Sequence, residues 1–298
     1  MELTLQNMIW SKGPIRNHYS TKPTEYASPN TDIIHLINSV TEQHNIIFIR
    51  NGSTEYVTDL FLFATNLELL KHPIILITSD GDRSMLQSHK QSTIQTILNS
   101  DKVIKWYTQN YDKSILHPKL KHYPIGFDLH TSAWFINNSV DEKIKFMVNM
   151  RKSKSTDSRV YNKILSDTHN SITHQERIEL FNTIKKNPNI DFVNKKIPFN
   201  IITEIYNNYN FVISPRGNGL DCHRTWELFL AGVIVITKTS SLDEMYTQNN
   251  LPVIILKDWS ELNDNLECKL EQWYKEHIDK TKIENIFERL TFNYWLNT

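Results

Sequence analysis

The segment from Phe211 to Thr237, FVISPRGNGLDCHRTWELFLAGVIVIT, gathers residues that could bind an anionic ligand. It holds Arg216, Arg224, Glu227 and three of the seven glycines of the 298-residue chain. Glycine lets a backbone approach a ligand closely, and arginine makes bidentate hydrogen bonds to phosphate oxygens. Two glycines two positions apart, next to one arginine and just before another, therefore predict a diphosphate site.

The elements around this segment would place the site at the edge of a sheet. An apolar strand ends at Ser214, Pro215 stops it, and a helix is expected to begin near Asp221, with its unpaired N–H groups facing the ligand. Glu227 lies one turn after Arg224, where its carboxylate could accept from ribose hydroxyls. The alternative is an i,i+3 ion pair between Arg224 and Glu227.

A second cationic stretch, RKSKSTDSR (151–159), follows an expected strand at 143–148. Arg159, at the start of an expected helix, is its strongest phosphate-binding candidate, and a solvated loop is the alternative. The candidate ligand-binding residues of the whole chain are Arg159, Ser214, Arg216, Gly217, Asn218, Gly219, Asp221, His223, Arg224 and Glu227.

Short β-branched runs alternate with helical patterns along the chain, which predicts an α/β fold with parallel sheets. The expected strands are 45–50, 74–78, 102–107, 143–148, 211–214, 233–237 and 253–256. The expected helices are 57–70, 84–100, 158–167, 174–187 and 222–232, followed by an amphipathic tail that packs back on the body. Glycines follow several of the expected strands, at the edge where open α/β sheets bind ligands.

Composition excludes several classes of protein. Lys+Arg and Asp+Glu both number 33, so no basic field would attract nucleic acid. No apolar run is long enough to span a bilayer, no signal peptide is visible, and the two cysteines are expected to be thiols in a reducing, cytoplasmic compartment. The chain has no GxxxxGK[ST] motif, which disfavours a P-loop. Cys222 stands in place of the third glycine of GxGxxG, which disfavours a dinucleotide-binding fold.

The stretch FVISPRGNGLDCHRTWELFLAGVIVI resembles the nucleotide-sugar-binding segment of exostosin-like glycosyltransferases, particularly short forms from large DNA viruses, algae and bacteria. WYTQNYD…HPKLKHYPIGFDLHT (106–131) is similar to a second block of that family. The resemblance implies a GT-B fold, in which two Rossmann-like domains face each other across a cleft. It further implies inverting transfer without metal or other cofactor, with Arg216 and Arg224 on the diphosphate and Glu227 on the ribose.

Three segments are expected on this basis: an acceptor domain at 1–135, a nucleotide-sugar domain at 136–265, and C-terminal helices at 266–298 that pack on the body. The partners would be a nucleotide-sugar donor, for which the resemblance favours UDP, and a glycan or glycoprotein acceptor. No nucleic acid and no membrane span are expected.

Inverting transfer needs a base that deprotonates the acceptor hydroxyl. Asp82 is the first candidate and Asp80 the second, since both follow an expected strand in LITSDGDRS; other candidates are Glu55, Asn51, Asp128 and His130. These acids could instead cap the following helix. Asp80-Gly81-Asp82 is also a D-x-D, so a metal-dependent GT-A transferase is an alternative. A non-catalytic module that binds nucleotide or glycan, through its seven Trp and twelve Tyr, is another.

Overall fold

The computed structural model describes residues 3–4, 7–12, 33–51, 57–129, 140–152, 160–167, 174–193, 195 and 197–297. The chain divides into two compact units. Unit 1 comprises residues 1–9, 126–217 and 222–298, and unit 2 comprises residues 10–125 and 218–221. Residues 126–129 thus belong to unit 1, ahead of the expected boundary after residue 135, and the helices of 266–298 are part of the same unit.

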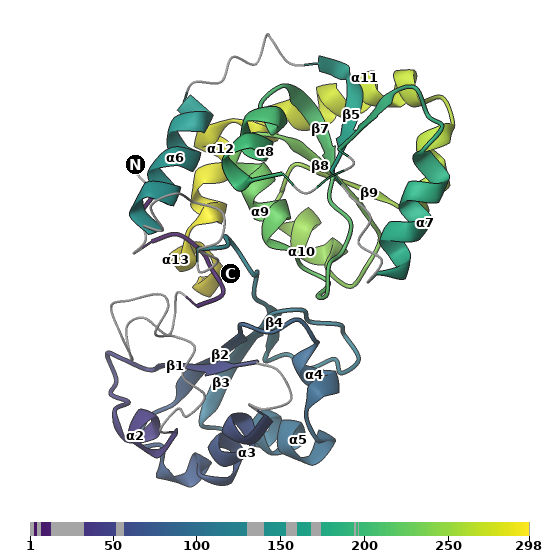
Figure 1. Ribbon diagram of the computed structural model, residues 1–298. Helices are drawn as coiled ribbons and strands as arrows, with labels where there is room; N and C mark the ends of the chain where they lie inside the picture. Colours follow the sequence, from purple (N-terminus) through teal and green to yellow (C-terminus); the bar gives the residue numbers. More distant parts are fainter. Residues whose placement is uncertain are drawn as a thin grey trace. The chain divides into compact units, whose positions relative to one another are not determined.

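Unit 2 is built on a parallel sheet of four strands in the order β1-β2-β3-β4. The strands are β1 (Ile46–Arg50), β2 (Ile74–Ser79), β3 (Val103–Thr108) and β4 (Leu120–His122). The helices are α2 (Ile33–Asn38), α3 (Val57–Thr65), η3 (Leu67–Leu69), α4 (Met85–Ser88) and α5 (Gln91–Asn99). Helices α2, α3 and α5 pack on one face of the sheet, where Phe63, Ile97 and Trp106 are fully buried (Figure 1).

Unit 1 contains a five-stranded parallel sheet in the order β6-β5-β7-β8-β9. The strands are β5 (Val160–Ser166), β6 (Ile190–Phe192), β7 (Tyr209–Ile213), β8 (Ile234–Lys238) and β9 (Val253–Leu256). This order, 2-1-3-4-5 in sequence terms, reverses direction between β5 and β7. In open α/β sheets the ligand crevice lies at the carboxyl ends of the two strands that flank such a reversal.

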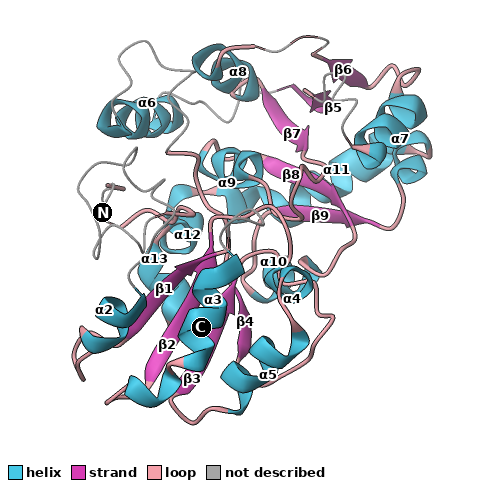
Figure 2. Cartoon of the chain, turned by 60° about the horizontal axis from the view of Figure 1, so that its bottom comes forward, coloured by secondary structure: helices cyan, strands magenta, loops and turns pink. Residues whose placement is uncertain are grey.

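Helices cover both faces of this second sheet (Figures 1 and 2). They are α6 (Val140–Lys152), α7 (Gln175–Ile184), α8 (Phe199–Tyr206), α9 (His223–Leu230), α10 (Asp243–Gln248), η6 (Trp259–Asn263), α11 (Leu266–His277), η7 (Ile278–Thr281), α12 (Ile283–Ile286), η8 (Phe287–Leu290) and α13 (Phe292–Leu296). The main core of the unit forms where strand residues meet α7, η6 and α11. The prediction of an α/β chain with two parallel-sheet domains is confirmed.

Six of the seven expected strands are confirmed, but the region before β5 was assigned wrongly. Residues 143–148 belong to helix α6 rather than a strand, because the buried positions Lys143, Ile144 and Met147 follow helical spacing. Residues 158–167 were expected to be helical, yet 160–166 form β5, between β6 and β7. The expected helix at 84–100 is divided into α4 and α5, and β4, β6, α8 and α10 were not foreseen.

The C-terminal tail packs on unit 1 through aromatic contacts. Trp295 lies 5.6 Å from Trp226 of α9, and Trp226 lies 5.4 Å from Phe229, both edge to face. Among the described residues, five tryptophans are fully buried: Trp10, Trp106, Trp226, Trp259 and Trp295. These residues therefore build the core instead of a carbohydrate-binding surface.

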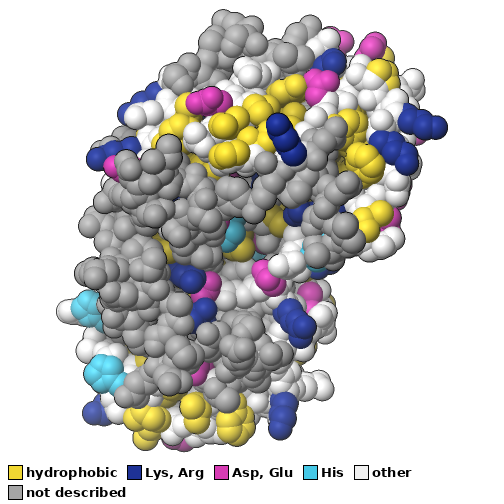
Figure 3. Space-filling view, in the orientation of Figure 1, with side chains coloured by type: hydrophobic (Ala, Val, Ile, Leu, Met, Phe, Trp, Pro, Cys, Tyr) yellow, Lys and Arg dark blue, Asp and Glu magenta, His cyan; other side chains and the backbone are white. Residues whose placement is uncertain are grey.

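Charges of both signs are spread over the face seen in Figure 3, as the balanced composition leads one to expect. No helix in the described part of the chain is long and apolar enough to cross a membrane.

Candidate functional site

Unit 1 contains a cavity of about 200 Å³ at the carboxyl ends of its strands. Asp167 follows β5 directly, Val193 follows β6, and His223, Arg224 and Glu227 come from α9, the helix after β7. The full lining is Asp128, Lys143, Asp167, Val193, Lys195, Ile197, Phe199, Ile202, Tyr206, His223, Arg224 and Glu227. The cavity therefore lies where the strand order reverses, the position at which open α/β sheets bind ligands.

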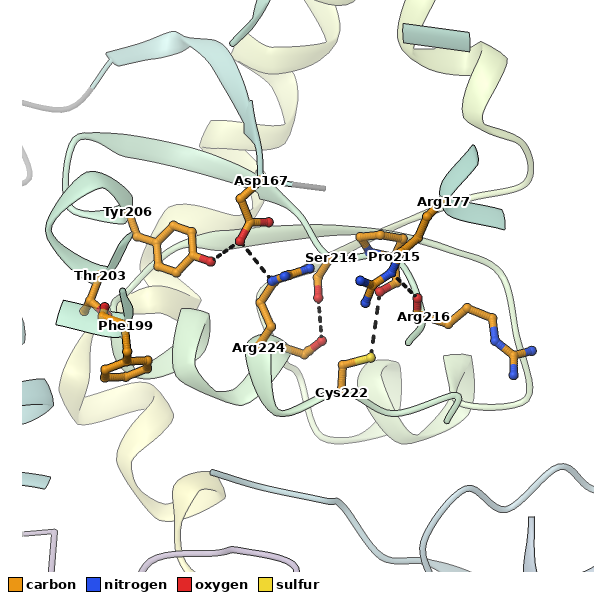
Figure 4. A network of polar contacts seen from close by, with 11 residues as sticks. Asp167, Arg177, Phe199, Thr203, Tyr206, Ser214, Pro215, Arg216, Cys222 and Arg224 are labelled. Atoms are coloured by element: carbon orange, nitrogen blue, oxygen red, sulfur yellow. Dashed lines mark hydrogen bonds and ion pairs between the residues drawn. The ribbon is translucent and has the colours of Figure 1, made fainter. Parts of the chain in front are cut away.

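Arg224 is held at one side of the cavity by an acid and a phenol (Figure 4). Its Nε lies 3.2 Å from Oδ2 of Asp167, and the hydroxyl of Tyr206 donates to the same oxygen at 2.5 Å. Burial works against the charge of Arg224, but the attraction of Asp167 and Tyr206 outweighs it, so the net effect is a raised pKa. Arg224 is therefore a permanent cation in a fixed orientation.

Glu227 lies at another side of the cavity, close to a lysine. Its Oε1 is 3.9 Å from Nζ of Lys143, and its side chain is only 14% exposed. Burial raises the pKa of Glu227, Lys143 lowers it, and the nearby carboxylate of Asp128 raises it again. The i,i+3 ion pair considered from the sequence is not what forms: Arg224 engages Asp167, and Glu227 faces Lys143.

The remaining wall of the cavity is apolar. Val193, Ile197, Phe199 and Ile202 line it, from the end of β6 to the first turns of α8. An apolar wall next to charged groups suits a ligand with one hydrophobic end and one polar end.

Arg216 does not line this cavity. Its guanidinium points away from Arg224 in Figure 4, and its carbonyl accepts a hydrogen bond of 2.9 Å from Nε of Arg177. Arg177, near the start of α7, lies at the glycine loop: one of its terminal nitrogens is 3.3 Å from where a Cβ on Gly217 would be. The expected convergence of the Arg216 and Arg224 side chains is not seen at this cavity, because Arg224 lines it and Arg216 does not.

The two glycines of the loop serve the close packing of the chain itself. A Cβ on Gly219 would lie 2.8 Å from Nδ2 of Asn110 and 2.9 Å from the carbonyl of Asp82. Gly217 donates to Sγ of Cys222 at 2.9 Å. Neither glycine has the positive φ seen at Gly126 and Gly232, so space rather than backbone conformation requires them.

Asn218 and Asp221 are engaged within unit 2. Nδ2 of Asn218 donates to Asp82 at 3.1 Å. Asp221 is buried: its N–H donates to Oδ1 of Asn110 at 2.9 Å, and its carboxylate accepts from the N–H of Ile125 at 2.8 Å. Asp221 thus joins the segments around Asn110 and Ile125 through its backbone and its carboxylate.

Ser214 and His223 take different positions around α9. Ser214 is buried, and its hydroxyl shares a hydrogen bond of 2.9 Å with that of Thr225. His223 lines the cavity, with its Nδ1 at 2.8 Å from the carbonyl of Gly126. Cys222 precedes α9 but places no side-chain hydrogen bond on its first turn.

The two candidate bases in unit 2 differ sharply. Asp80 forms an ion pair with Nε of Arg50 at 2.7 Å, lies 3.9 Å from Nζ of Lys12, and is only 10% exposed. Its backbone has a positive φ of 67°, and Gln109 accepts a hydrogen bond from its N–H at 2.9 Å. Asp82 is exposed and accepts from Asn218. Neither acid caps α4, whose N-cap is Ser84.

The remaining candidates lie elsewhere. Arg159, Glu55 and His130 fall outside the described residues. Arg151 and Lys152 belong to the last turn of α6, not to a loop after a strand, and Arg151 donates to the carbonyl of Thr281. Asn51 is buried and donates to the carbonyl of Arg83 at 2.8 Å, while Asp128 lines the cavity of unit 1.

Several residues that line or adjoin the cavity were not predicted from the sequence, among them Lys143, Asp167, Arg177 and Tyr206. Asp167 and Lys143 lie in the two regions whose secondary structure was assigned wrongly. Arg177 and Tyr206 belong to helices with no evident motif. A correct assignment of β5 would have found Asp167, since it directly follows a strand at the edge of the sheet.

No protein-family model matches the sequence, and no curated protein matches it. The solved structures that are similar at low sequence identity include three trehalose-phosphate synthases. The first is the alpha,alpha-trehalose 6-phosphate synthase of Burkholderia multivorans, with 10% identity and a TM-score of 0.45 over 85% of this chain and 70% of that one.

The second is the UDP-forming alpha,alpha-trehalose-phosphate synthase of Burkholderia vietnamiensis, with 9% identity and a TM-score of 0.45 over 84% of this chain and 72% of that one. The third is the UDP-forming enzyme of the same description from Burkholderia xenovorans, with 9% identity and a TM-score of 0.48 over 89% and 74% of the two chains.

Proposed function

We propose that this chain is a glycosyltransferase that moves a sugar from a nucleoside-diphosphate sugar, with UDP as the nucleotide, to a hydroxyl of a glycan. The observation that carries the proposal is the cavity of unit 1, which places Arg224 and Glu227 one helical turn apart at the reversal of the strand order. The resemblance of the 211–236 segment to exostosin-like transferases supports the same reading.

The walls of the cavity match the parts of a nucleotide. The diphosphate would lie against Arg224 and the neighbouring Arg177, whose pKa is lowered by burial and by the charge of Arg224. Two like charges near each other favour an anion between them. Glu227 would accept hydrogen bonds from the ribose, and the apolar wall of Val193, Ile197 and Phe199 would cover the base.

The reaction would be a single in-line displacement at the anomeric carbon, with inversion. The acceptor oxygen forms the new bond to that carbon, its proton passes to a carboxylate, and the bond to the diphosphate oxygen breaks. The leaving diphosphate gains negative charge, which fixed arginines stabilise without reorganisation. Asp82 stays the proposed base, because Asp80 is already paired with Arg50 and Lys12 and is a weaker proton acceptor.

Transfer is proposed to need no metal. In the D-x-D of a metal-dependent transferase both carboxylates must be available to the ion, and a cation at Asp80 would have to displace the guanidinium of Arg50 at 2.7 Å. The arginines of unit 1 would supply the compensating charge instead.

A panel of UDP- and GDP-sugars tests the function. Nucleotide release is measured with simple glycan acceptors, with and without EDTA, alongside a thermal-shift assay for each nucleotide. We expect stabilisation and turnover with a UDP-sugar at the same rate in EDTA. Loss of turnover in EDTA would favour the metal-dependent alternative, binding without turnover of any sugar nucleotide would favour a non-catalytic module, and absence of nucleotide binding would overturn the proposal.

A further inference from the structure

Lys143 is a buried cation that enters the cavity from outside the nucleotide-binding segment. It lies on α6, a helix that packs against α8 and α9 and is anchored by the buried Ile144 and Met147. The side chain of Lys143 is 6% exposed, in the range where lysine is rare unless its charge is compensated.

Three groups surround its ammonium. It donates a hydrogen bond to the carbonyl of Asp128, lies 4.4 Å from the ring centroid of Phe199, and lies 3.9 Å from Oε1 of Glu227. The first two contacts satisfy and orient the ammonium, and the third places its charge beside a carboxylate.

The distance of 3.9 Å is informative because it is too long for a hydrogen bond and short enough for strong attraction between charges. Lys143 thus favours the ionised form of Glu227 without filling the lone pairs of Oε1. An ionised carboxylate accepts hydrogen bonds at both oxygens, whereas a protonated one must use one oxygen as a donor.

We propose that Lys143 is a positioning residue of the nucleotide site, whose buried ammonium keeps Glu227 ionised so that the carboxylate can accept from the ribose hydroxyls. This inference rests on the proposed function, since it needs a nucleotide in the cavity. It adds a residue from α6 to a site otherwise built from the sheet edge, α8 and α9.

Other charged and titratable groups also face Glu227. Besides Lys143, they are His223 and Arg224 of its own helix and Asp128 of the segment before α6. Asp167, Tyr206 and Lys195 line the same cavity. Burial raises the pKa of Glu227 and Lys143 opposes that rise, so removal of the ammonium raises this pKa further. As the pH is lowered, a variant without Lys143 should therefore lose ribose recognition at a higher pH than the wild type does.

The test compares the affinities of UDP and 2′-deoxy-UDP by isothermal titration calorimetry between pH 6 and pH 9. Both probes carry the same diphosphate and base, so their affinity ratio cancels changes in the overall charge of the cavity and reports the ribose contact. In the wild-type protein at pH 8 we expect UDP to bind about tenfold more tightly, as for one lost hydrogen bond to a charged group.

In Lys143→Met the ratio should fall close to one at pH 7 and recover towards pH 9. Glu227→Gln should give a ratio near one at every pH. Lys145→Met removes the same charge from the exposed side of α6 and should behave like the wild type. Lys143→Arg, which keeps the charge, should retain discrimination at pH 7 and provides the test if Lys143→Met does not fold.

The role of Lys143 would be overturned if Lys143→Met showed the affinity ratio and pH profile of the wild type. It would also be overturned if Lys143→Arg lost the discrimination between UDP and 2′-deoxy-UDP as fully as Glu227→Gln does. A wild-type protein that binds neither probe would overturn the proposed function instead.

Discussion

At the scale of residues, the proposed nucleotide site has arginines for the diphosphate and a carboxylate for the ribose. Arg177 contacts the loop through its Nε, which donates to the carbonyl of Arg216, and through a terminal nitrogen close to Gly217. Arg177 is not among the residues that line the cavity together with the apolar wall. Arg177 would act on the charged end of the ligand and leave the nucleoside end unaffected.

Arg177→Ala is therefore expected to weaken UDP binding about tenfold or more, the usual effect of one lost charge-assisted hydrogen bond, and to leave uridine binding unchanged. Competition against a fluorescent nucleotide measures the affinities for UDP and for uridine. Lys186→Ala, an exposed cation just after the same helix, is the matched control. Equal losses for UDP and uridine would show that Arg177 supports the fold rather than the phosphate.

The sequence allowed Arg224 and Glu227 to be proposed because they lie in one continuous stretch, with spacing that a single helix fixes. It did not reveal Asp167 or Lys143, since each reaches the cavity from a segment far away along the chain. Arg216 was chosen for its adjacency to the glycines, but adjacency does not determine direction, and its guanidinium points away from Arg224 (Figure 4).

At the scale of elements, α9 is followed by a glycine at a position where a side chain is disfavoured for two reasons. Gly232 has a φ of +68°, which only glycine adopts readily. A Cβ there would also clash with the guanidinium of Arg151, the arginine at the end of α6 that reaches Thr281. The glycine thus lets α6, α9 and the C-terminal helices meet.

Gly232→Ala should lower the free energy of unfolding by roughly 2 kcal/mol or more, from the left-handed backbone and the displaced arginine. Urea denaturation followed by circular dichroism measures the loss. Gly217→Ala is the comparison, because its φ is not left-handed and its nearest contacts, at 3.2 and 3.3 Å, are side-chain atoms. Equal stability of the Gly232 variant and the wild type would contradict this reading of α9.

Strands rich in β-branched and aromatic residues were predictable, whereas β5 was not. IILIT and VIVIT are buried on both faces, as parallel strands are, and were recognised from composition alone. By contrast, β5 has the sequence VYNKILS, and its polar residues at 162 and 163 resemble a helical pattern. Three-residue strands such as β4 and β6 depend on their neighbours in the sheet and have no periodicity of their own.

At the scale of the whole molecule, the two units are expected to have different tasks. Donor binding is expected to depend on residues of unit 1, and turnover is expected to depend also on Asp82 of unit 2. The parallel-sheet class of both units was predictable from the alternation of strands and helices. The sequence could not show that residues 218–221 belong to unit 2, because this follows from their packing against Asn110 and Asp82.

Asp82→Asn should lower the rate of transfer by about 10²-fold or more, the usual contribution of a general base, while UDP affinity is kept. Steady-state kinetics and calorimetry on the same preparation measure the two quantities. Asp101→Asn, an exposed acid of the same unit, serves as control. A variant with the wild-type rate would remove Asp82 as the base and direct attention to Asp128, which lines the cavity of unit 1.

The central claim is that the cavity of unit 1 binds a nucleoside diphosphate through the cation that Asp167 and Tyr206 hold in place. Calorimetric titration of UDP into the wild-type protein and into folded Arg224→Ala tests it most directly. We predict measurable binding by the wild type and a loss of about 10- to 100-fold in the variant. Failure of the wild type to bind UDP or GDP, or the same affinity in both proteins, would contradict the claim.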